Sequence, residues 1–337
     1  MILVTGGTGL VGAHLLYSLL KEGNKVRAIH RTTSDFASVK QVFSYYTENW
    51  EPLFNKIEWV EANLTDIPAL TLAFEGVEKV YHAAAYVSFH PKHFYKLKKS
   101  NIEGTANVVN LSLFFAIKKL CHISSVATLG NSEHLQLIHE DLPWNPDAEN
   151  SDYSITKYGA EMEVWRGAQE GLATVIVNPG VILGSGFWNS GTGAIFSKVN
   201  KGQPFFANGE MGFVDVRDVA NICIQLMESP IKNERFILVS ENISYKRLLS
   251  IMALAFGKNP PKIELKSWML TLGWKLDFLK SALTGSRQNL FKSTANAMVS
   301  KKHYNNQKIK NALGYTFISL HETIINTVSN FKKTNFL

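Results

Sequence analysis

The segment Thr5-Gly6-Gly7-Thr8-Gly9-Leu10-Val11-Gly12 decides the fold of this chain, because it joins a short apolar strand to an apolar helix. The strand begins at Ile2, and the helix is expected to run from Leu10 to about Lys21. In such a turn, Gly6 allows a tight reversal, Gly9 lets the backbone approach a pyrophosphate, and Gly12 permits close packing of helix on strand. The helix N-terminus offers free N–H groups and a favourable dipole to phosphates. Although glycines also serve plain turns, the position after a strand favours a dinucleotide site. The residues expected to form it here are Thr5, Gly6, Gly9, Leu10, Val11 and Gly12.

Strand and helix patterns alternate through the N-terminal half, which predicts an α/β fold with a doubly wound parallel sheet covered on both faces. Beyond Pro179-Gly180 the alternation breaks down and glycines mark a loop. We therefore expect a Rossmann domain over residues 1–180 and a smaller mixed substrate-binding region over 181–337, with segments such as 213–228 returning to the Rossmann core. Further strands are expected at 25–30, 57–61, 79–82, 119–124 and 173–178, and helices at 38–46, 67–74, 101–117, 153–170, 216–228, 245–256, 268–283 and 319–331.

The charge balance of the 337 residues is basic, with a net charge of +7 and an isoelectric point near 9.2. The basic residues are spread thinly and are not interleaved with aromatics, so a nucleic-acid partner is not expected. A solvated basic face is the simpler interpretation, and a site for an anionic ligand such as a phosphorylated cofactor is the alternative. Cys121 and Cys223 lie in apolar runs without metal-like spacing, which predicts buried free thiols in a reducing compartment and no metal site.

No uncharged apolar run reaches the ~20 residues that a membrane span needs. The best candidate, residues 268–283, is interrupted by Lys275, Asp277 and Lys280 and is typical of an amphipathic helix. Burial of this helix in the fold is expected, and contact with a membrane surface or a partner is the alternative. Because the first strand starts at Ile2, no signal peptide is expected, and the expected compartment is the cytoplasm.

The residues after the second strand bear on which dinucleotide is bound. NAD sites usually place an acid there for the ribose hydroxyls, whereas an Arg accommodates the 2′-phosphate of NADP. This strand ends Ile29-His30-Arg31-Thr32-Thr33-Ser34, with no acid before Asp35. Arg31 favours NADP, with NAD still possible. A solvent-facing Arg without a ligand is the alternative.

Tyr153-Ser154-Ile155-Thr156-Lys157 places a tyrosine and a lysine four residues apart, on the same side of one helical turn. A tyrosine hydroxyl has an unperturbed pKa near ~10 and is a poor acid–base group at neutral pH. A nearby ammonium lowers that pKa, so the pair is expected to exchange protons with a carbonyl or an alcohol.

In these motifs the chain resembles the extended short-chain dehydrogenase/reductase family, over about residues 1–220. Its strand Val26-Arg27-Ala28-Ile29-His30-Arg31 is similar to the dihydroflavonol reductase-like and 3β-hydroxysteroid dehydrogenase-like branches. The motifs that match in order are the glycine turn, His82-Ala83-Ala84-Ala85, Asn101-Ile102-Glu103-Gly104-Thr105, Ile123 to Gly130, Tyr153 to Lys157 and Val177-Asn178-Pro179-Gly180, with a fainter match at Phe213 to Ala220.

The resemblance implies roles for individual residues. Tyr153 would be the acid–base group, and Lys157 would bind the nicotinamide ribose and tune Tyr153. Ser125 would hydrogen-bond the reacting oxygen; Ser124 is the rival for this role, but its position one residue nearer the strand favours a structural one. Asn101 would support a proton relay. Asn178 stands where many relatives carry Arg, which puts any role of that Arg in doubt. His82, His90, His93 and His122 are interpreted as packing or surface residues. Further cofactor contacts are implied for Asn63, Leu64, Ala83, Ala84, Ala85, Ser124, Pro179 and Val181.

These observations favour an NADP(H)-dependent reductase or dehydrogenase acting on an apolar or aromatic carbonyl or alcohol. Dehydration is disfavoured, because Val126-Ala127-Thr128 has no acid pair. A nucleotide-sugar epimerase with tightly bound NAD is the first alternative, and a redox-inactive dinucleotide-binding regulator is the second. A homodimer is expected only from the resemblance. Five aromatic side chains that could line an apolar pocket are Phe187, Trp188, Phe196, Phe205 and Phe206.

Overall fold

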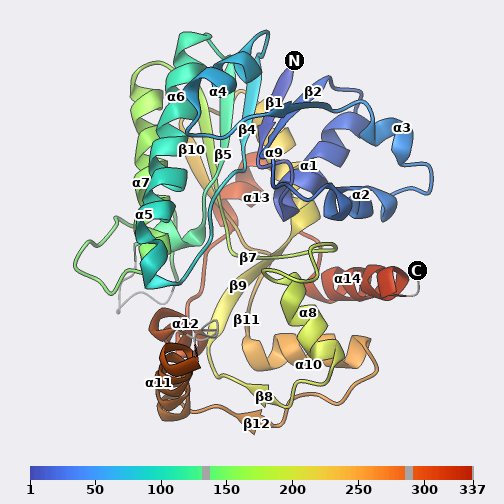
Figure 1. Ribbon diagram of the computed structural model, residues 1–337, viewed down its shortest axis with the longest axis vertical. Coiled ribbons are helices and arrows are strands. Elements are labelled where there is room, and N and C mark those ends of the chain that lie inside the picture. Colours follow the sequence, from blue (N-terminus) through green and yellow to red (C-terminus); the bar gives the residue numbers. More distant parts are fainter. Residues whose placement is uncertain (131–136, 285–290, 336–337) are drawn as a thin grey trace.

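A parallel sheet forms the centre of the N-terminal part of the molecule (Figure 1). The computed structural model describes residues 1–130, 137–284 and 291–335. Over these residues the sheet has seven strands in the order β10-β6-β5-β4-β1-β2-β3, all parallel. The doubly wound α/β fold expected from the sequence is confirmed. Its strands are β1 (Ile2–Thr5), β2 (Val26–His30), β3 (Glu58–Glu61), β4 (Lys79–His82), β5 (Lys119–Ile123), β6 (Thr174–Pro179) and β10 (Glu234–Leu238).

Helices cover both faces of this sheet, because its central strands are buried on both sides. Every residue of β1, β5 and β6 is buried, as is typical of strands in parallel sheets. Two separate apolar clusters form the core, one on each face. One face carries α1 (Leu10–Lys21), α2 (Phe36–Ser44), α3 (Glu51–Phe54), α9 (Val216–Glu228) and α13 (Gln307–Leu313), and the other α4 (Ile67–Phe74), α5 (Phe94–Leu97), α6 (Gly104–Phe114) and α7 (Asp152–Gln169).

A smaller mixed region lies beyond the carboxyl ends of the strands (Figure 1). Its core joins Phe196, Phe213 and Ile324 from three different elements. Its strands are β7 (Val181–Leu183), β9 (Glu210–Asp215) and β11 (Glu241–Ser244) in one sheet and β8 (Phe205–Phe206) and β12 (Ile263–Glu264) in another. Its helices are α8 (Gly193–Asn200), α10 (Tyr245–Ala255), α11 (Ser267–Thr284), α12 (Lys292–Val299) and α14 (Leu320–Asn335).

The chain crosses between the two regions more than once. After β9, Asp215 caps α9 by accepting a hydrogen bond from the Arg217 amide at 2.7 Å. Helix α9 then packs on α1, and β10 joins the large sheet beside β6. Residues 216–238 therefore belong to the packing of the first region, although they follow strands of the second.

Two expectations about buried residues have opposite outcomes. Cys121 and Cys223 are buried free thiols, as expected. The expectation that the amphipathic helix near 268–283 is buried is wrong, because α11 packs through one narrow face only. Trp268 is 62% exposed and Leu276 is 56% exposed. In the described part of the chain, no helix is both long and apolar enough to cross a bilayer.

The strand order reverses beside β1. The chain passes from β1 outward through β2 to β3, then returns to the other side of β1 with β4. In open α/β sheets, ligands bind in the crevice outside the carboxyl ends of the strands at such a reversal. The carboxyl ends of β1 and β4 therefore mark where a site is expected.

Candidate active site

The glycine turn after β1 fits closely against the end of β4. Gly6 has a φ of 72°, and a Cβ there would lie 2.6 Å from the Ala84 amide nitrogen. A Cβ on Gly12 would lie 2.1 Å from the Gly6 carbonyl oxygen, so Gly12 permits packing against the turn itself. Gly9 caps α1 without a side-chain hydrogen bond, which leaves the first helical N–H groups for a ligand. The geometry of this turn fits a bound pyrophosphate.

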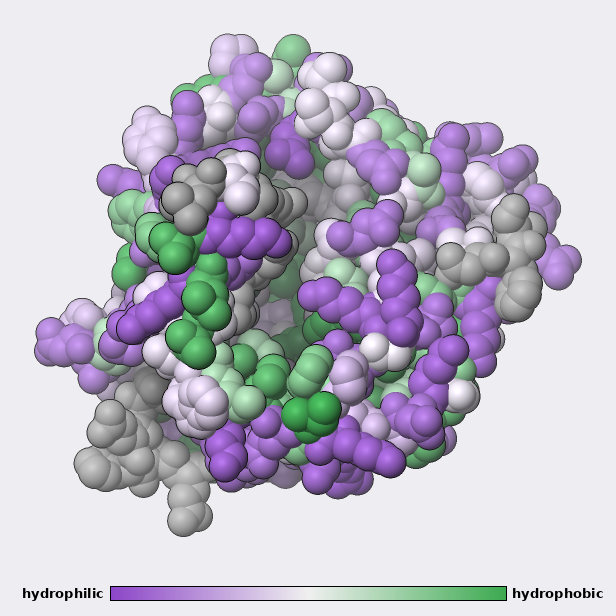
Figure 2. All heavy atoms as spheres, turned by 60° about the horizontal axis from the view of Figure 1, so that its bottom comes forward, coloured by the Kyte–Doolittle hydropathy of each residue, from purple (hydrophilic) through white to green (hydrophobic). Residues whose placement is uncertain are grey.

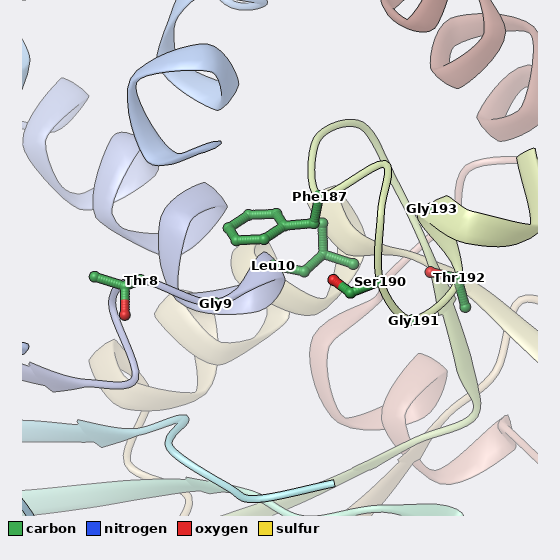
Figure 3. A pocket seen from close by; sticks show the side chains of 8 residues that line it. All are labelled: Thr8, Gly9, Leu10, Phe187, Ser190, Gly191, Thr192 and Gly193. Atoms are coloured by element: carbon green, nitrogen blue, oxygen red, sulfur yellow. The ribbon is translucent and has the colours of Figure 1, made fainter. Parts of the chain in front are cut away.

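A cavity of about 300 Å³ opens beside this turn (Figure 3). Phe187 lies next to Leu10, on the loop that connects β7 to α8. Phe187 has a φ of 55°, a conformation that is strained for a residue with a bulky side chain. The cavity is lined by Thr8, Gly9, Leu10, Phe187, Ser190, Gly191, Thr192 and Gly193.

The aromatic residues expected to line one apolar pocket lie in different places. Trp188 and Phe196 belong to the core of the smaller region. Phe206 is buried, Phe205 is exposed, and Phe187 lines the cavity at the glycine turn. The five residues therefore do not line a common pocket, because Phe187 and Trp188 lie on the loop after β7, Phe196 lies on α8, and Phe205 and Phe206 form β8.

The edge of the crevice at β2 presents a free basic group. Arg31 follows the last residue of β2 and is exposed, and its guanidinium makes no hydrogen bond or ion pair with any described residue. Asp35 caps α2, accepting from the Ala37 amide and the Ser38 hydroxyl, both at 2.8 Å. Asp35, the first acidic residue after β2, therefore accepts hydrogen bonds at the N-terminus of α2, whereas the guanidinium of Arg31 can bind an anion.

Two residues after β3 stand near the same edge. Asn63 is exposed, and Leu64 is buried against Gly104, where a Cβ would come 2.9 Å from the Leu64 Cβ. The Leu64 carbonyl accepts a hydrogen bond from Asn107 Nδ2 at 2.8 Å. The Oδ1 of Asn63 accepts from the amide and the hydroxyl of Thr65, both at 3.4 Å, so Asn63 and Leu64 both hold the turn after β3.

Ser125, Tyr153 and Lys157 come together at the carboxyl end of β5. Ser151 caps α7 by accepting from the Ser154 amide at 3.1 Å, so the helix begins just before Tyr153. Lys157, one turn later, is buried and donates to the Ile123 carbonyl, at the end of β5, at 2.9 Å. Ser125 follows β5 by two residues and interacts with the Tyr153 hydroxyl. The three side chains therefore share one site.

The charges in this site differ from the expectation in one respect. Burial raises the pKa of Tyr153, and the hydrogen bond from Ser125 lowers it only in part. The expected net lowering of the Tyr153 pKa is wrong, because burial raises that pKa and the Lys157 ammonium is directed to the Ile123 carbonyl. Burial also lowers the pKa of Lys157 to about 8, while Glu161 raises it. At neutral pH Tyr153 is protonated and Lys157 is charged.

The charge of Lys157 also acts on the buried histidines of β4 and β5. Burial, together with the charge of Lys157, lowers the pKa of His82 to about 3. The His82 ring lies 2.7 Å from Thr5 Oγ1 and 2.9 Å from Thr105 Oγ1. His122 is buried beside His82, with ring centroids 5.1 Å apart. These histidines are neutral packing residues between β1, β4 and β5, as interpreted from the sequence.

Asn101 lies in a π-helical turn, Lys98–Glu103, where an uninterrupted α-helix was expected from 101 to 117. Asn101 accepts from the Tyr86 amide at 2.7 Å and donates to the Tyr86 carbonyl at 3.0 Å. It also donates to Thr156 at 3.2 Å. Such single turns of π-helix are frequent at functional sites. Asn101 therefore holds the loop after β4 against α7, beside Tyr153.

The remaining residues expected to contact the cofactor lie at the ends of β4 and β6. Ala83, Ala84 and Ala85 follow β4 directly, and Ala84 meets the glycine turn. Pro179 is the last residue of β6, and Val181, two residues later, is the first residue of β7. All of these positions lie at carboxyl ends of strands, where the sheet leaves backbone groups accessible.

Glu161 is a site residue that the sequence analysis missed. It is fully buried on α7, one turn after Lys157. Its Oε2 accepts from Ser124 at 2.7 Å and Thr128 at 2.8 Å, and its Oε1 accepts from Arg235 at 2.9 Å. Its position four residues after Lys157 was the available signal, but a glutamate in a helix has no distinctive pattern. The contact assigns Ser124 to this buried network, so its hydroxyl faces away from the reacting group.

Asn178 belongs to the same network. Its Nδ2 donates to the Ser125 carbonyl at 3.1 Å, to Thr128 at 2.9 Å and to Glu161 at 3.0 Å. A side chain with this geometry holds the backbone that carries Ser125. Asn178, the residue that departs from the pattern of the resembled family, therefore helps to hold the backbone of the site in position.

Glu161→Gln is expected to shift the alkaline limb of the pH–activity profile to lower pH. The negative charge of Glu161 raises the pKa of Lys157, so its removal lets Lys157 lose its proton earlier. Activity of the unchanged protein is expected to fall as the pH rises above about 8. Steady-state rates between pH 6 and 10 give the pH at which the activity falls on the alkaline side.

Glu163→Gln is the matched control, because Glu163 lies on the same helix and pairs with Arg166 at the surface. Glu161→Asp, which keeps the charge, is expected to restore part of the limb. A Glu161→Gln protein with an unchanged melting temperature and an unchanged alkaline limb of its pH–activity profile would show that Glu161 does not set the pKa of Lys157.

Comparisons with known proteins agree with this geometry. The model of the NAD dependent epimerase/dehydratase family matches residues 2–238. A putative dihydroflavonol 4-reductase of Synechocystis sp. is 29% identical over 343 residues, covering 99% of this chain and 95% of that protein. Sterol demethylase protein B of Methylococcus capsulatus is 29% identical over 265 residues, covering 78% and 76%. The structure of a UDP-glucose 4-epimerase from Thermotoga maritima, solved with UDP-glucose, is 22% identical with a TM-score of 0.77 and covers 99% of both chains.

Proposed function

The chain belongs to the NAD dependent epimerase/dehydratase family, and from that premise we propose that it is an NADP(H)-dependent reductase or dehydrogenase of an apolar or aromatic carbonyl or secondary alcohol. Its relatives are named reductases and dehydrogenases, and the chain is an oxidoreductase. The observation that carries the proposal is the meeting of Ser125, Tyr153 and Lys157 at the carboxyl end of β5, which only β4 separates from the strand before the glycine turn.

The glycine turn, the uncapped start of α1 and Arg31 would hold a nicotinamide dinucleotide. When bound, the cofactor supplies or accepts a hydride. The chain itself handles the proton. Because burial raises the pKa of Tyr153, its hydroxyl keeps a proton at neutral pH and can donate it to a carbonyl oxygen as that oxygen gains charge. Ser125 would donate a second hydrogen bond to the same oxygen.

Lys157 has two tasks in this proposal. Its buried ammonium would bind the ribose next to the nicotinamide ring. Its positive charge would also favour the phenolate that Tyr153 becomes after it donates its proton. In the opposite direction, the phenolate of Tyr153 accepts the proton of an alcohol while hydride leaves the same carbon. The proton and the hydride together account for the two hydrogens that separate alcohol from carbonyl.

The preference for NADP is proposed from the charges at the end of β2. Arg31 is exposed and unpaired among the described residues, and Asp35 is committed to capping α2. A 2′-phosphate can form charge-assisted hydrogen bonds with the guanidinium. An NAD ribose would meet no free carboxylate at this position of the described structure.

The apolar nature of the substrate is proposed from the loop after β4. Phe89 is exposed, and its ring centroid lies 5.9 Å from that of Tyr153. Val87 on the same loop is also exposed. An apolar substrate beside Tyr153 would cover these side chains, which otherwise face water. Relatives named for flavonoid and sterol conversions support the same class.

The solved epimerase supports the epimerase alternative through its fold alone, because it is 22% identical, and the name of the family also includes epimerases. A nucleotide-sugar diphosphate calls for basic residues, but the stretch from Gly184 to Gly212 holds only Lys198 and Lys201, and both are exposed. A regulator without redox activity is disfavoured, because Tyr153 and Lys157 are both present.

One assay tests the proposal. The purified protein is expected to consume NADPH in the presence of members of a panel of aromatic and alicyclic ketones, and to consume NADH less efficiently. Absorbance of the nicotinamide at 340 nm (a general property of the reduced ring) follows the reaction. Oxidised or reduced cofactor that co-purifies in a one-to-one ratio and does not exchange would favour the epimerase instead.

A further inference from the structure

The net positive charge of the chain comes from one segment. Residues 258–302 contain nine Lys and Arg and two Asp and Glu, a net charge of +7 that equals the net charge of all 337 residues. The rest of the chain is balanced, with 26 basic and 26 acidic residues. The excess of basic residues therefore lies in the segment that contains α11, although Lys292 and Lys301 pair with Glu149 and Glu210 outside it.

Helix α11 carries an apolar stripe on its outward face. At about 100° per residue, positions 268, 269, 272, 276 and 279 fall on one side of the helix, and all five side chains are exposed. Lys275 and Lys280 are exposed at the two borders of this stripe. We define the α11 face as Trp268, Met269, Leu272, Leu276 and Leu279, together with these two lysines.

The opposite side of α11 attaches the helix to the protein. Leu270 is buried in a small cluster with Ala207 and Ala295, and Trp274 packs against that cluster. Helix α12 lies beside α11 in the sequence and in space. The helix is therefore held by its inner side, and its exposed apolar stripe contributes nothing to the core.

Exposed apolar patches of this kind are uncommon on monomeric proteins and mark an interaction surface. Figure 2 shows strongly hydrophobic side chains at the surface on the side where Figure 1 places α11, next to hydrophilic side chains and a central hollow. Further lysines precede the helix, because Lys262 and Lys266 are both exposed.

We propose that the α11 face docks the protein on a bilayer surface that contains anionic phospholipids, with α11 lying in the interface. A helix with an apolar face bordered by lysines binds in this way, since the apolar side chains enter the headgroup boundary and the ammonium groups reach the phosphates. The exposed Lys262, Lys266, Lys275 and Lys280 complement an anionic leaflet, to which each nearby basic residue contributes about 1 kcal/mol.

The docked face would stand next to the entrance of the candidate active site. Phe291, the residue before α12, lies with its ring 5.1 Å from that of His90. His90 follows Phe89, which contacts Tyr153. An apolar substrate dissolved in the bilayer would reach Tyr153 along this side. This consequence rests on the proposed function, whereas the docking itself does not.

Vesicle co-sedimentation tests the docking without any enzymatic turnover. The full chain is expected to sediment with vesicles of phosphatidylcholine and phosphatidylglycerol, and much less with phosphatidylcholine alone. Leu276→Glu is expected to weaken binding by about tenfold or more, because a charge replaces an apolar group that enters the interface. The double variant Lys275→Gln/Lys280→Gln is expected to weaken it by about 25-fold, roughly fivefold for each lysine.

The matched control is Leu72→Glu. Leu72 is exposed to the same extent as Trp268, at 62%, but lies on α4 on the large sheet, so its replacement is expected to leave sedimentation unchanged. Binding that is absent, equal for both vesicle types, or insensitive to Leu276→Glu would overturn the proposal. A concentration-dependent dimer that Leu276→Glu dissociates, without vesicle binding, would assign the α11 face to a second copy of the chain. Loss of sedimentation in variants that keep full activity on water-soluble ketones would separate this surface from the catalytic proposal.

Discussion

Tyr153→Phe is expected to lower turnover by at least about 100-fold while cofactor affinity stays within a few-fold of the unchanged protein. The phenol holds a proton at neutral pH and is the group proposed to donate it to the carbonyl oxygen, because burial raises its pKa and Ser125 hydrogen-bonds it. Removing the hydroxyl leaves the ring, its contact with Phe89 and the glycine turn in place. Rates of NADPH consumption and the quenching of intrinsic fluorescence by the cofactor measure the two quantities separately.

Tyr158→Phe is the matched control for this change. Tyr158 lies on the same helix, five residues later, and its ring stacks on Trp144 with centroids 4.5 Å apart. Loss of its hydroxyl is expected to leave turnover nearly unchanged. If Tyr153→Phe kept its rate, the proton would have another source, and the role proposed for Tyr153 would be withdrawn.

Arg31→Asp is expected to change the ratio of catalytic efficiencies with NADPH and NADH by about 10- to 100-fold in favour of NADH, the range of a lost charge-assisted hydrogen bond. The exposed guanidinium has no protein partner among the described residues, so its loss costs little stability. The new carboxylate would repel the 2′-phosphate and could accept hydrogen bonds from the ribose hydroxyls. kcat/KM for both cofactors at one ionic strength gives the ratio.

Lys56→Asp makes the same change of charge at an exposed site just before β3, at the amino end of the strand. It is expected to leave the cofactor ratio unchanged. A ratio that moved equally in both variants would indicate a general electrostatic effect and not a contact of Arg31 with the phosphate.

The sequence was sufficient for features that depend on neighbouring residues. The apolar strand before Gly6 and the glycines of the turn predicted the first strand, the first helix and their junction, and all three are observed. The spacing of Tyr153 and Lys157 predicted a shared helical side, because four residues make about one turn. Alternation of strand and helix patterns predicted the parallel sheet, since strands buried on both faces need continuous apolar runs.

Other features depend on residues far apart in the chain, and the sequence did not reveal them. The apolar residues of α11 have the same pattern whether they face a core or water, so the expected burial of this helix was wrong. The lysine that was expected to lower the pKa of Tyr153 is held instead by the Ile123 carbonyl on another element. The role of Glu161 in the site was recognised only from the fold, which places Ser124, Thr128 and Arg235 around its carboxylate.

Local pattern and side-chain chemistry are properties of short stretches of chain, so they were enough to predict the fold class, the glycine turn and the candidate site residues. Which ionisable groups are desolvated, which residues they contact and which apolar face stays exposed became known only from the folded structure. The physical reason is that desolvation and charge–charge interactions depend on distances in space, and the folding of the whole chain sets those distances.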